Sequence, residues 1–275
     1  MCGRVVSKVD FPTLQRITRT NLSHHSTKYT KSYNLSPGCY QAALIHSKAP
    51  ISFPAEETHK CEDTAPDQVL SAMKWGFHLP TSRKFLFNIR AETAAVKFSS
   101  LAAANRCVIV ASGYYEWTAA RCPYYLFPAS SPLLYLAGVY IEEGGELKAA
   151  VLTKQAPERL SWLHERTPCI LAETDIARWI DVEKGWEDVI DYVLGDKVGE
   201  VGLTWHRVSR LISTSEKEGE DLCLPLEEYN RKIRTGGIHQ FFQPVNKRKR
   251  AQPEAAAEMK RAKMEDQTAK KSPSQ

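Results

Sequence analysis

Residues 106–117, RCVIVASGYYEW, form the stretch that says most about this chain. β-branched and aromatic side chains dominate it, which is typical of a strand. Near its end Glu116 stands between Tyr115 and Trp117. Carboxylates in apolar, aromatic surroundings serve as general acids or bases. The stretch therefore predicts a strand that leads into a site, with a water-facing glutamate on an edge strand as the alternative.

Other parts of the chain extend the pattern of this strand. We expect further strands at residues 133–141, 147–153 and 204–209, the first two joined by the turn EEGG at 142–145. Helices are expected at residues 10–18 (with Asp10 as the cap), 157–164, 174–180 and 186–194. Strands outnumber helices and do not alternate regularly with them. The fold class predicted is α+β, a single compact domain with a central, mostly antiparallel, barrel-like sheet and peripheral helices.

Composition divides the chain into three parts. Residues 1–235 are expected to form one folded domain, followed by a short motif at 236–242. Residues 243–275 contain almost no large apolar residue, so they cannot offset their ordering entropy and are expected to be disordered. KRKR at 247–250 and KRAK at 260–263 resemble a bipartite nuclear-import signal, which predicts a nuclear protein at replication forks, with the cytosol as a second compartment. A solvated basic tail is the alternative.

The overall composition excludes several classes of protein. Hydrophobic residues make up 43% and charged residues 25% of the chain, as in ordinary globular proteins. We see no apolar run near the ~20 residues that cross a bilayer and no secretory signal, so we expect no membrane partner. The seven cysteines are odd in number and widely spaced, which argues against disulfides and against a structural zinc site. No metal or cofactor is expected.

Charge is distributed unevenly along the chain. The net charge is +5, and residues 243–275 alone carry nine basic and four acidic residues. Residues 1–50 carry seven basic residues and one acidic residue, whereas residues 151–200 carry six basic and eleven acidic residues. The basic region surrounds the N-terminus, which suits an anionic partner there. A chance imbalance of surface charge is the alternative.

Cys2 is the first candidate nucleophile, because it directly follows the initiator Met1 in MCGR. Removal of Met1 would leave an α-amine and a thiol on adjacent carbons, with ordinary pKa values near ~8 and ~8.5. The amine can attack an aldehyde to form an imine, and the thiol can then close a five-membered thiazolidine. An N-terminal-nucleophile amidase is a second chemistry for the same group, and a chance cysteine is the third reading.

Other candidates lie in short polar or aromatic stretches. His164 in HERTPCIL (164–171) would exchange protons near neutral pH, although structural histidines are equally common. Asn88 in FNIRAET (87–93) would orient an amine or carbonyl, and Arg90 would bind a phosphate. Trp75 in KWGF (74–77) offers a flat surface for a base, although such a residue is more often core.

Taken together, these stretches resemble one family. MCGR, YNLSPG, MKWGF, FNIRAET, SGYYEW and HERTPCIL follow the order expected of the SOS response-associated peptidase (SRAP) family, over about residues 2–230. The resemblance implies a compact α+β domain with a barrel-like sheet. It also implies that the mature N-terminal cysteine attacks the aldehyde of an abasic site in single-stranded DNA. The product is a thiazolidine crosslink that shields the lesion during replication, with reversal and possible lyase or autopeptidase activity.

The resemblance assigns roles residue by residue. It implies the catalytic residues Cys2 as nucleophile, Asn88 as holder of the α-amine, and Glu116 and His164 as proton carriers. The implied DNA contacts are Gly3, Arg4, Pro37, Trp75, Arg90 and Arg166. Two departures stand out. Arg90 follows Asn88 by two residues, as in bacterial rather than animal members, and Thr167 replaces the usual Met. A monomer is expected.

The stretch TGGIHQFF (235–242) resembles a sliding-clamp-binding motif. Ile238, Phe241 and Phe242 would form its hydrophobic plug, and KRKR behind them would approach an acidic clamp surface. Thr235 stands where the motif normally has Gln. The alternative is that these aromatic side chains pack back on the domain.

Three functions are therefore compared. The first is covalent capture of abasic single-stranded DNA by Cys2. The second is an N-terminal-nucleophile cysteine peptidase, to which the family name itself points. The third is a non-enzymatic DNA-binding adaptor that reaches the clamp through its tail. Dependence on Cys2 separates the first two from the third, and the substrate separates the first from the second.

Overall fold

A computed structural model gives the fold, and it describes residues 3–52, 55–57, 67–78 and 84–241. In chain order, its strands are β1 (Arg4–Ser7), β2 (Leu22–His24), β3 (Ser32–Leu35), β4 (Tyr40–His46), β5 (Glu56–Glu57), β6 (Gln68–Trp75), β7 (Phe77–His78), β8 (Phe85–Leu86), β9 (Asn88–Arg90), β10 (Arg106–Ala111), β11 (Gly113–Trp117), β12 (Pro123–Pro128), β13 (Leu134–Glu143), β14 (Glu146–Gln155), β15 (Arg166–Pro168), β16 (Ile170–Leu171) and β17 (Leu203–Arg207).

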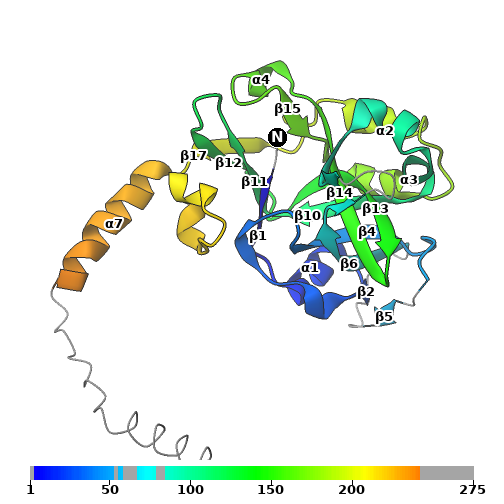
Figure 1. Cartoon of the computed structure of the whole chain (residues 1–275), viewed down its shortest axis with the longest axis horizontal. Helices are drawn as coiled ribbons and strands as arrows, with labels where there is room; N and C mark the ends of the chain where they lie inside the picture. The colour runs from blue at the N-terminus through cyan, green and yellow to red at the C-terminus, as the bar shows by residue number, and fades with distance from the viewer. Residues whose placement is uncertain (1–2, 53–54, 58–66, 79–83, 242–275) are drawn as a thin grey trace, which may run out of the picture. The chain divides into compact units, whose positions relative to one another are not determined.

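Helices are short and mostly lie between strands (Figure 1). The α-helices are α1 (Phe11–Thr18), α2 (Ala91–Lys97), α3 (Ser99–Ala104), α4 (Glu158–Ser161), α5 (Ile176–Ile180), α6 (Ile190–Leu194) and α7 (Leu226–Phe241). The 3-10 helices are η1 (Ser26–Lys28), η2 (Glu173–Asp175), η3 (Arg210–Ser213) and η4 (Glu220–Cys223).

The centre of the molecule is a closed barrel. Strands β6, β4, β10, β13 and β14 pair in that order with antiparallel neighbours, and a parallel pairing of β14 with β6 closes the ring. Closure satisfies the backbone groups that would otherwise face solvent at a sheet edge. The α+β class with a barrel-like, mostly antiparallel sheet is confirmed.

A second sheet of five strands extends from the barrel, in the order β17-β12-β11-β1-β3. The stretch 106–117 links the two, because β10 lies in the barrel and β11 lies in the second sheet, with only Ser112 between them. Gly113 starts β11 at a close approach, since a Cβ there would lie 2.5 Å from the Leu126 carbonyl oxygen. The predicted strand is therefore confirmed as two strands that carry one segment from the core to Glu116.

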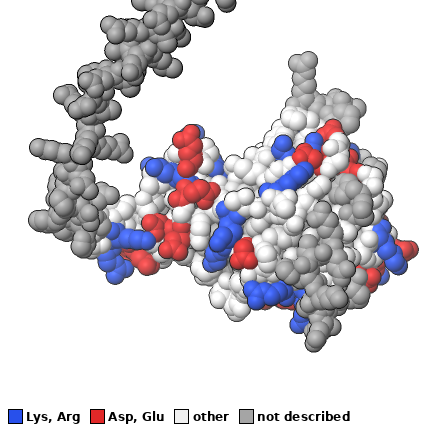
Figure 2. All heavy atoms as spheres, turned by 90° about the horizontal axis from the view of Figure 1, so that it is seen from below, with Lys and Arg blue, Asp and Glu red and all other residues white. Residues whose placement is uncertain are grey.

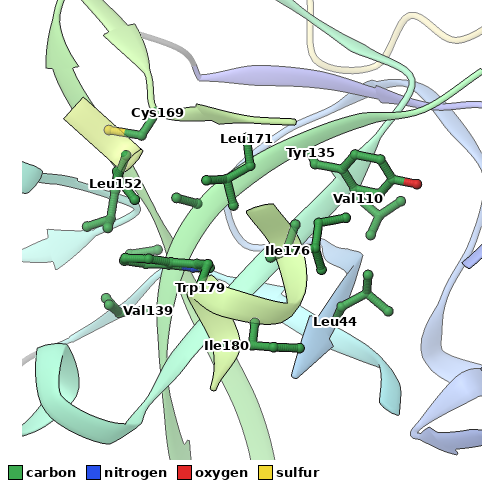
Figure 3. Packing of buried hydrophobic residues seen from close by; sticks show 14 of the residues in the cluster. Leu44, Val110, Tyr135, Val139, Leu152, Cys169, Leu171, Ile176, Trp179 and Ile180 are labelled. Carbon is green, nitrogen blue, oxygen red and sulfur yellow. The ribbon is translucent and has the colours of Figure 1, made fainter. Parts of the chain in front are cut away.

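The core packs helices against the outside of the barrel (Figure 3). Trp179 of α5 is 1% exposed, and its indole N–H donates to the Cys107 carbonyl at 2.9 Å. Its cluster also contains apolar residues of four barrel strands, of the segment that includes β16, and of α5 itself: Leu44, Val110, Tyr135, Val139, Leu152, Cys169, Leu171, Ile176 and Ile180. Burial of these side chains fixes α5 against β10 and β4.

Several predicted elements are confirmed with changed limits. The hairpin of residues 133–153 appears as β13 and β14, and α1 begins after Asp10, whose carboxylate accepts a hydrogen bond from the Thr13 N–H at 3.0 Å. The helix predicted at 186–194 begins only at Ile190. The Gly185 N–H donates to Asp188 Oδ2 at 2.9 Å and Trp186 packs on Trp179, which holds the first residues in a loop.

The chain forms two units, Met1–Lys232 and Ile233–Gln275. Both this boundary and the predicted boundary at 235 fall within α7. The predicted tail of residues 243–275, with its import signal, lies outside the described residues. Within the described ranges, no helix has the length and apolar character needed to cross a membrane.

Surface charge is mixed on the face shown in Figure 2. There, Lys and Arg side chains lie next to Asp and Glu side chains, and neither sign forms a continuous area. Ion pairs of the described residues include Lys232 with Asp221, and Lys148 with Glu143 at 2.5 Å. The predicted concentration of basic charge near the N-terminus therefore does not extend over this face.

Candidate active site

Glu116 lies at the end of β11, beside the start of β1. The two strands are antiparallel with Arg4 opposite Tyr115, so the next residue along β11 is Glu116 and the next along β1 toward the N-terminus is Gly3. The Glu116 side chain is 3% exposed, and its Oε1 accepts a hydrogen bond from the Trp117 N–H at 3.2 Å. A buried carboxylate of β11 thus lies beside the N-terminal end of β1.

Asn88 starts β9, which runs parallel to β14 with Asn88 opposite Val151. Immediately before it, the Phe87 carbonyl accepts a hydrogen bond from the indole N–H of Trp75 at 3.0 Å. Trp75 is 0% exposed, so no ring face is available for a base. The stacking role predicted for Trp75 does not fit this position. The indole instead fixes the backbone that presents Asn88.

Pro37 and Gly3 are both half-buried. Pro37 belongs to the turn between β3 and β4, which is held to the end of β6, because the Gly38 N–H donates to the Trp75 carbonyl at 2.7 Å. Gly38 has φ +96°, a conformation that glycine adopts without strain. The SPG turn and Trp75 therefore form one unit beside β9.

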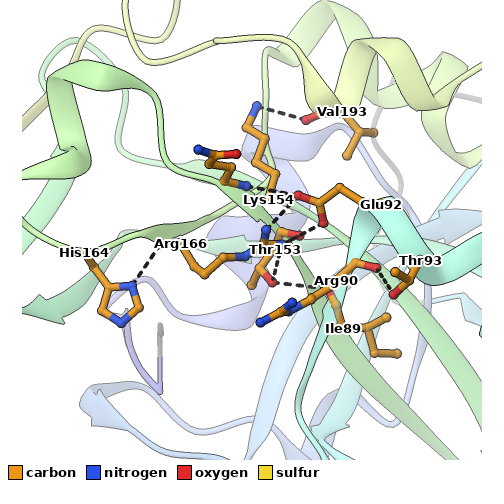
Figure 4. A network of polar contacts seen from close by, with 10 residues as sticks. Ile89, Arg90, Glu92, Thr93, Thr153, Lys154, His164, Arg166 and Val193 are labelled. Carbon is orange, nitrogen blue, oxygen red and sulfur yellow. Dashed lines mark hydrogen bonds and ion pairs between the residues drawn. The ribbon is translucent and has the colours of Figure 1, made fainter.

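His164 lies between α4 and β15 and is half-buried. The backbone N–H of Arg166 donates to His164 Nδ1 at 2.9 Å (Figure 4). Because Nδ1 is the acceptor, the neutral ring carries its proton on Nε2. His164 therefore presents a defined N–H that can be given up or taken back, as a proton carrier requires.

Arg166 makes a two-armed ion pair with Glu92 of α2. Its Nη1 and Nη2 lie 2.7 and 2.8 Å from the two carboxylate oxygens, and Nη2 also donates to the Thr153 carbonyl at 2.5 Å (Figure 4). The hydrogen bond from Arg166 lowers the pKa of Glu92. The guanidinium predicted to contact phosphate is thus held by Glu92, so a phosphate would share it or displace the carboxylate.

Arg90 and Arg4 differ in their surroundings. The exposed Arg90 side chain makes no hydrogen bond or ion pair with another described residue, and in Figure 4 it extends from β9 toward the Arg166 side of the site. Arg4 is half-buried and donates to Asn34 Oδ1 at 3.2 Å. Asn34 is fixed in turn by the carbonyls of Thr214 and Lys217, each at 2.9 Å. Arg90 is therefore the cation best placed for a phosphate.

One hydroxyl contact joins the strands that carry Glu116 and Arg166. Tyr114 of β11 and Thr167 of β15 are 1% and 4% exposed, and their hydroxyl oxygens lie 3.2 Å apart. On its other sides, β15 pairs with β14, which also pairs with β9. The structure thus brings the strands of Asn88, Glu116 and Arg166 into one connected set.

Some predicted residues lie beyond what the structure describes. Cys2 is outside the described residues, as is Phe242. Ile238 and Phe241 belong to the helical backbone of α7. The hydrophobic plug expected from these residues stays a prediction.

The sequence reading missed Glu92 as a partner of Arg166, 74 residues away. It also missed an aromatic cluster beside the site, formed by Trp162, Tyr124 and Trp205. Contacts of this kind join distant segments, so no local spacing marks them. Within the described ranges, no group of three or more His, Cys, Asp or Glu side chains is arranged to hold a metal ion.

Comparison with known proteins identifies the family. The model of the family "SOS response associated peptidase (SRAP)" matches residues 1–215. The chain belongs to the SRAP family. The motifs that carry Asn88, Glu116 and His164 all fall within the matched SRAP region.

Three curated relatives are named abasic site processing proteins. This SRAP chain is 26% identical to YMR114C of Saccharomyces cerevisiae and 28% identical to HMCES of Xenopus tropicalis, with 72% and 69% of the chain covered. It spans 54% and 64% of the length of those two relatives. YoqW of Bacillus subtilis is 23% identical, with 81% of the chain and 98% of that protein covered.

Solved structures share the SRAP fold. A protein from Bacteroides thetaiotaomicron has a TM-score of 0.62 at 14% identity, covering 82% of this chain and 99% of that one. A phage-related protein from Bordetella bronchiseptica has a TM-score of 0.57 at 20% identity, covering 76% of this chain and 95% of that one. At these identities the likeness concerns the fold alone.

Proposed function

We propose that this protein captures abasic sites in single-stranded DNA by forming a covalent bond between the sugar aldehyde and Cys2. The observation that carries the proposal is the buried carboxylate of Glu116 on β11, one residue beyond the paired Arg4 and Tyr115 and so beside the N-terminal end of β1. Cys2 is bonded to Gly3, so its Cα lies within about 3.8 Å of the Gly3 Cα. The relatives named abasic site processing proteins support the same substrate.

The chemistry proceeds in two bond-forming steps after Met1 is removed. The α-amine of Cys2 adds to the aldehyde carbon, and loss of water gives an imine. The thiol then adds to the same carbon while its proton passes to the nitrogen, which closes a thiazolidine. Glu116 and His164 are the proton carriers that we assign to these steps, because one is buried beside β1 and the other presents a defined Nε2 proton.

Asn88 and the arginines position the reactants. We assign the Asn88 amide to the α-amine, since the segment before Asn88 is fixed by Trp75. Arg90 binds a phosphate of the strand, with Arg4 and Arg166 as further cations near the site. Non-covalent binding should therefore weaken as salt increases.

The experiment uses purified mature protein and a single-stranded oligonucleotide with one abasic site. A heat-stable band of reduced mobility on a denaturing gel is expected, and it should be absent for Cys2→Ala. Intact mass must show loss of Met1, because a retained Met1 blocks the α-amine. No shifted band with the wild-type protein, or an unchanged band with Cys2→Ala, would refute the proposal.

Cys2→Ser separates the amine from the thiol. This variant keeps the α-amine, so it can form the imine, but it lacks the sulfur nucleophile. We expect a borohydride-trapped adduct and strand cleavage by β-elimination in place of a stable crosslink. A stable crosslink with Cys2→Ser would show that the thiol is not part of the product. Insertion of one Ala before Cys2 should abolish the thiazolidine although the thiol is unchanged.

The family description as a peptidase supports a second candidate, an N-terminal-nucleophile cysteine peptidase. Here the Cys2 thiol would attack a carbonyl, with its own amine as the base. A burst of product from an amide substrate that disappears with Cys2→Ala would favour this function. Crosslinking to abasic DNA with no such burst would favour the first.

A further inference from the structure

An exposed aromatic cluster borders the candidate active site. Trp162, just after α4, is 46% exposed. Its ring centroid lies 4.9 Å from that of Tyr124, nearly perpendicular at 80°, and 6.2 Å from that of Trp205. The Trp162 indole N–H donates to the Arg159 carbonyl at 3.0 Å, which fixes the direction of the ring. The three side chains, which we call the aromatic patch, thus present a large and pre-oriented indole to solvent.

The register of the second sheet places the patch beside Glu116. Tyr124 of β12 is opposite Glu116 of β11 on one side and opposite Arg207 of β17 on the other. Directly opposed residues of antiparallel strands point to the same face, and neighbouring strands are about 5 Å apart. Glu116, Tyr124 and Arg207 therefore form one row that runs from the buried carboxylate to the surface.

The same row ends in a positive charge. Arg207 is exposed and makes no hydrogen bond or ion pair with another described residue. Trp162 also lies two residues before His164, so the chain connects the patch to the site from a second side. A stacking aromatic with a neighbouring arginine is the combination by which proteins bind unpaired bases and their phosphates. A single exposed aromatic side chain is common on protein surfaces and would not indicate a binding site, whereas this patch combines three aromatic side chains with an arginine.

We propose that the aromatic patch stacks an unpaired base next to the abasic nucleotide, with Arg207 on a phosphate of the same strand. This inference rests on the proposed function only in taking single-stranded DNA as the partner. The stacked base would hold the strand while the aldehyde reaches the end of β1. The patch recognises no particular base, because every base has a stacking face.

The experiment measures non-covalent binding of full-length mature protein to a fluorescent single-stranded oligonucleotide. Tetrahydrofuran replaces the abasic sugar, so no aldehyde is present and binding does not depend on Cys2 chemistry. Trp162→Ala should weaken binding about 5- to 100-fold, and Trp162→Phe should retain most of it. Arg207→Ala should weaken binding and reduce the slope of its salt dependence by about one.

Two controls make the result specific. Tyr192→Ala removes another exposed aromatic side chain, on α6, and should leave binding unchanged. A second oligonucleotide carries tetrahydrofuran at the flanking positions as well, so it has no neighbouring base to stack. The wild-type protein should bind it more weakly, and Trp162→Ala should no longer reduce the affinity. Thermal unfolding checks that each variant is folded.

The outcomes separate this inference from the proposed function. If Trp162→Ala binds the first oligonucleotide as tightly as the wild type, or weakens both oligonucleotides equally, the stacking role is overturned and the patch is left to a protein partner. If binding depends on Trp162 but the wild type does not crosslink a true abasic site, the proposed function fails and the stacking role stands.

Discussion

Two buried charges, ten residues apart, mark opposite ends of the stretch 106–117. Arg106 begins β10 in the barrel and is 2% exposed, and Glu116 near the end of β11 is 3% exposed. The Arg106 guanidinium donates to the carbonyls of Ala103, Trp179, Asp181 and Lys184 at 2.5–2.8 Å. The Glu116 carboxylate accepts a hydrogen bond from the backbone N–H of Trp117, the next residue in the chain.

The difference lies in what surrounds each charge. Arg106 donates to backbone carbonyls near the end of α3, within α5 and in the loop after α5, so it joins helices to the barrel. Burial lowers its pKa. Glu116 stands on a strand row with Tyr124 and beside the residue bonded to Cys2. Burial of a charge alone therefore does not identify a catalytic residue. The partners decide, because backbone carbonyls fix structure whereas titratable neighbours allow proton transfer.

The largest effect on stability is expected from Arg106→Ala. Removal of the guanidinium leaves several buried carbonyls without their donor, which should reduce the free energy of unfolding by about 3 kcal/mol or more. Urea unfolding measures the loss. Arg178→Ala, an exposed arginine of α5, is the control and should cost about 1 kcal/mol or less. Equal losses in the two variants would show that Arg106 is not a structural centre.

Glu116→Gln, in contrast to Arg106→Ala, should change the crosslinking rate strongly and the stability only slightly. The amide keeps the size of the side chain but cannot carry protons between reactants, so the crosslinking rate should fall about 100- to 10,000-fold. Its unfolding free energy should change by about 1 kcal/mol or less. Single-turnover crosslinking on gels gives the rate, with the exposed Glu143→Gln as the matched control. If Glu116→Gln crosslinks at the normal rate but loses much of its free energy of unfolding, Glu116 is a structural residue like Arg106.

The sequence predicted the strand and the Glu116 end of this contrast, but not the role of Arg106. The abundance of β-branched and aromatic residues predicted the strand at 106–117, and the excess of strands over helices predicted the α+β class. Arg106 gave no signal, because its carbonyl partners come from segments as far as 78 residues away. The prediction that Trp75 offers a stacking surface does not fit the structure, for a similar reason. A local pattern does not tell whether a ring faces solvent or the Phe87 carbonyl.

The candidate site shows the same limit. The motifs named Asn88, Glu116, His164 and the arginines, each from its own short stretch. They did not predict that Glu92 holds Arg166 or that Trp162 packs on Tyr124. Such pairs arise from tertiary contact, and a single sequence carries no mark of them.

A medium effect is expected from the hydroxyl pair that connects the two strands of the site. Tyr114→Phe or Thr167→Val leaves the other buried hydroxyl without this partner, which should cost about 1–2 kcal/mol. The double variant should lose less than the sum, because the second removal leaves no orphaned group. A double-mutant cycle of urea unfolding measures the coupling. If the contact only stabilises the fold, crosslinking by the folded variants stays normal. If it aligns β11 with β15, crosslinking falls as well.

The smallest effect is expected from Glu92→Gln, and its pH dependence is the informative part. Because Arg166 lowers the pKa of Glu92 from its ordinary 4.5, the ion pair stabilises the fold fully above about pH 4.5 and loses its effect as pH falls through the lowered value. The Glu92 side chain is 39% exposed, so the loss at neutral pH should be about 0.2–1 kcal/mol. Urea unfolding of the wild type and the variant should differ near pH 7 and converge as the pH falls through the lowered pKa of Glu92, where the carboxylate becomes protonated and resembles Gln. A stability difference that grows as the pH falls would contradict this assignment.

The same variant frees Arg166 for phosphate, so DNA binding should tighten slightly while stability falls. This exchange is expected where a site keeps a cation paired until its ligand binds.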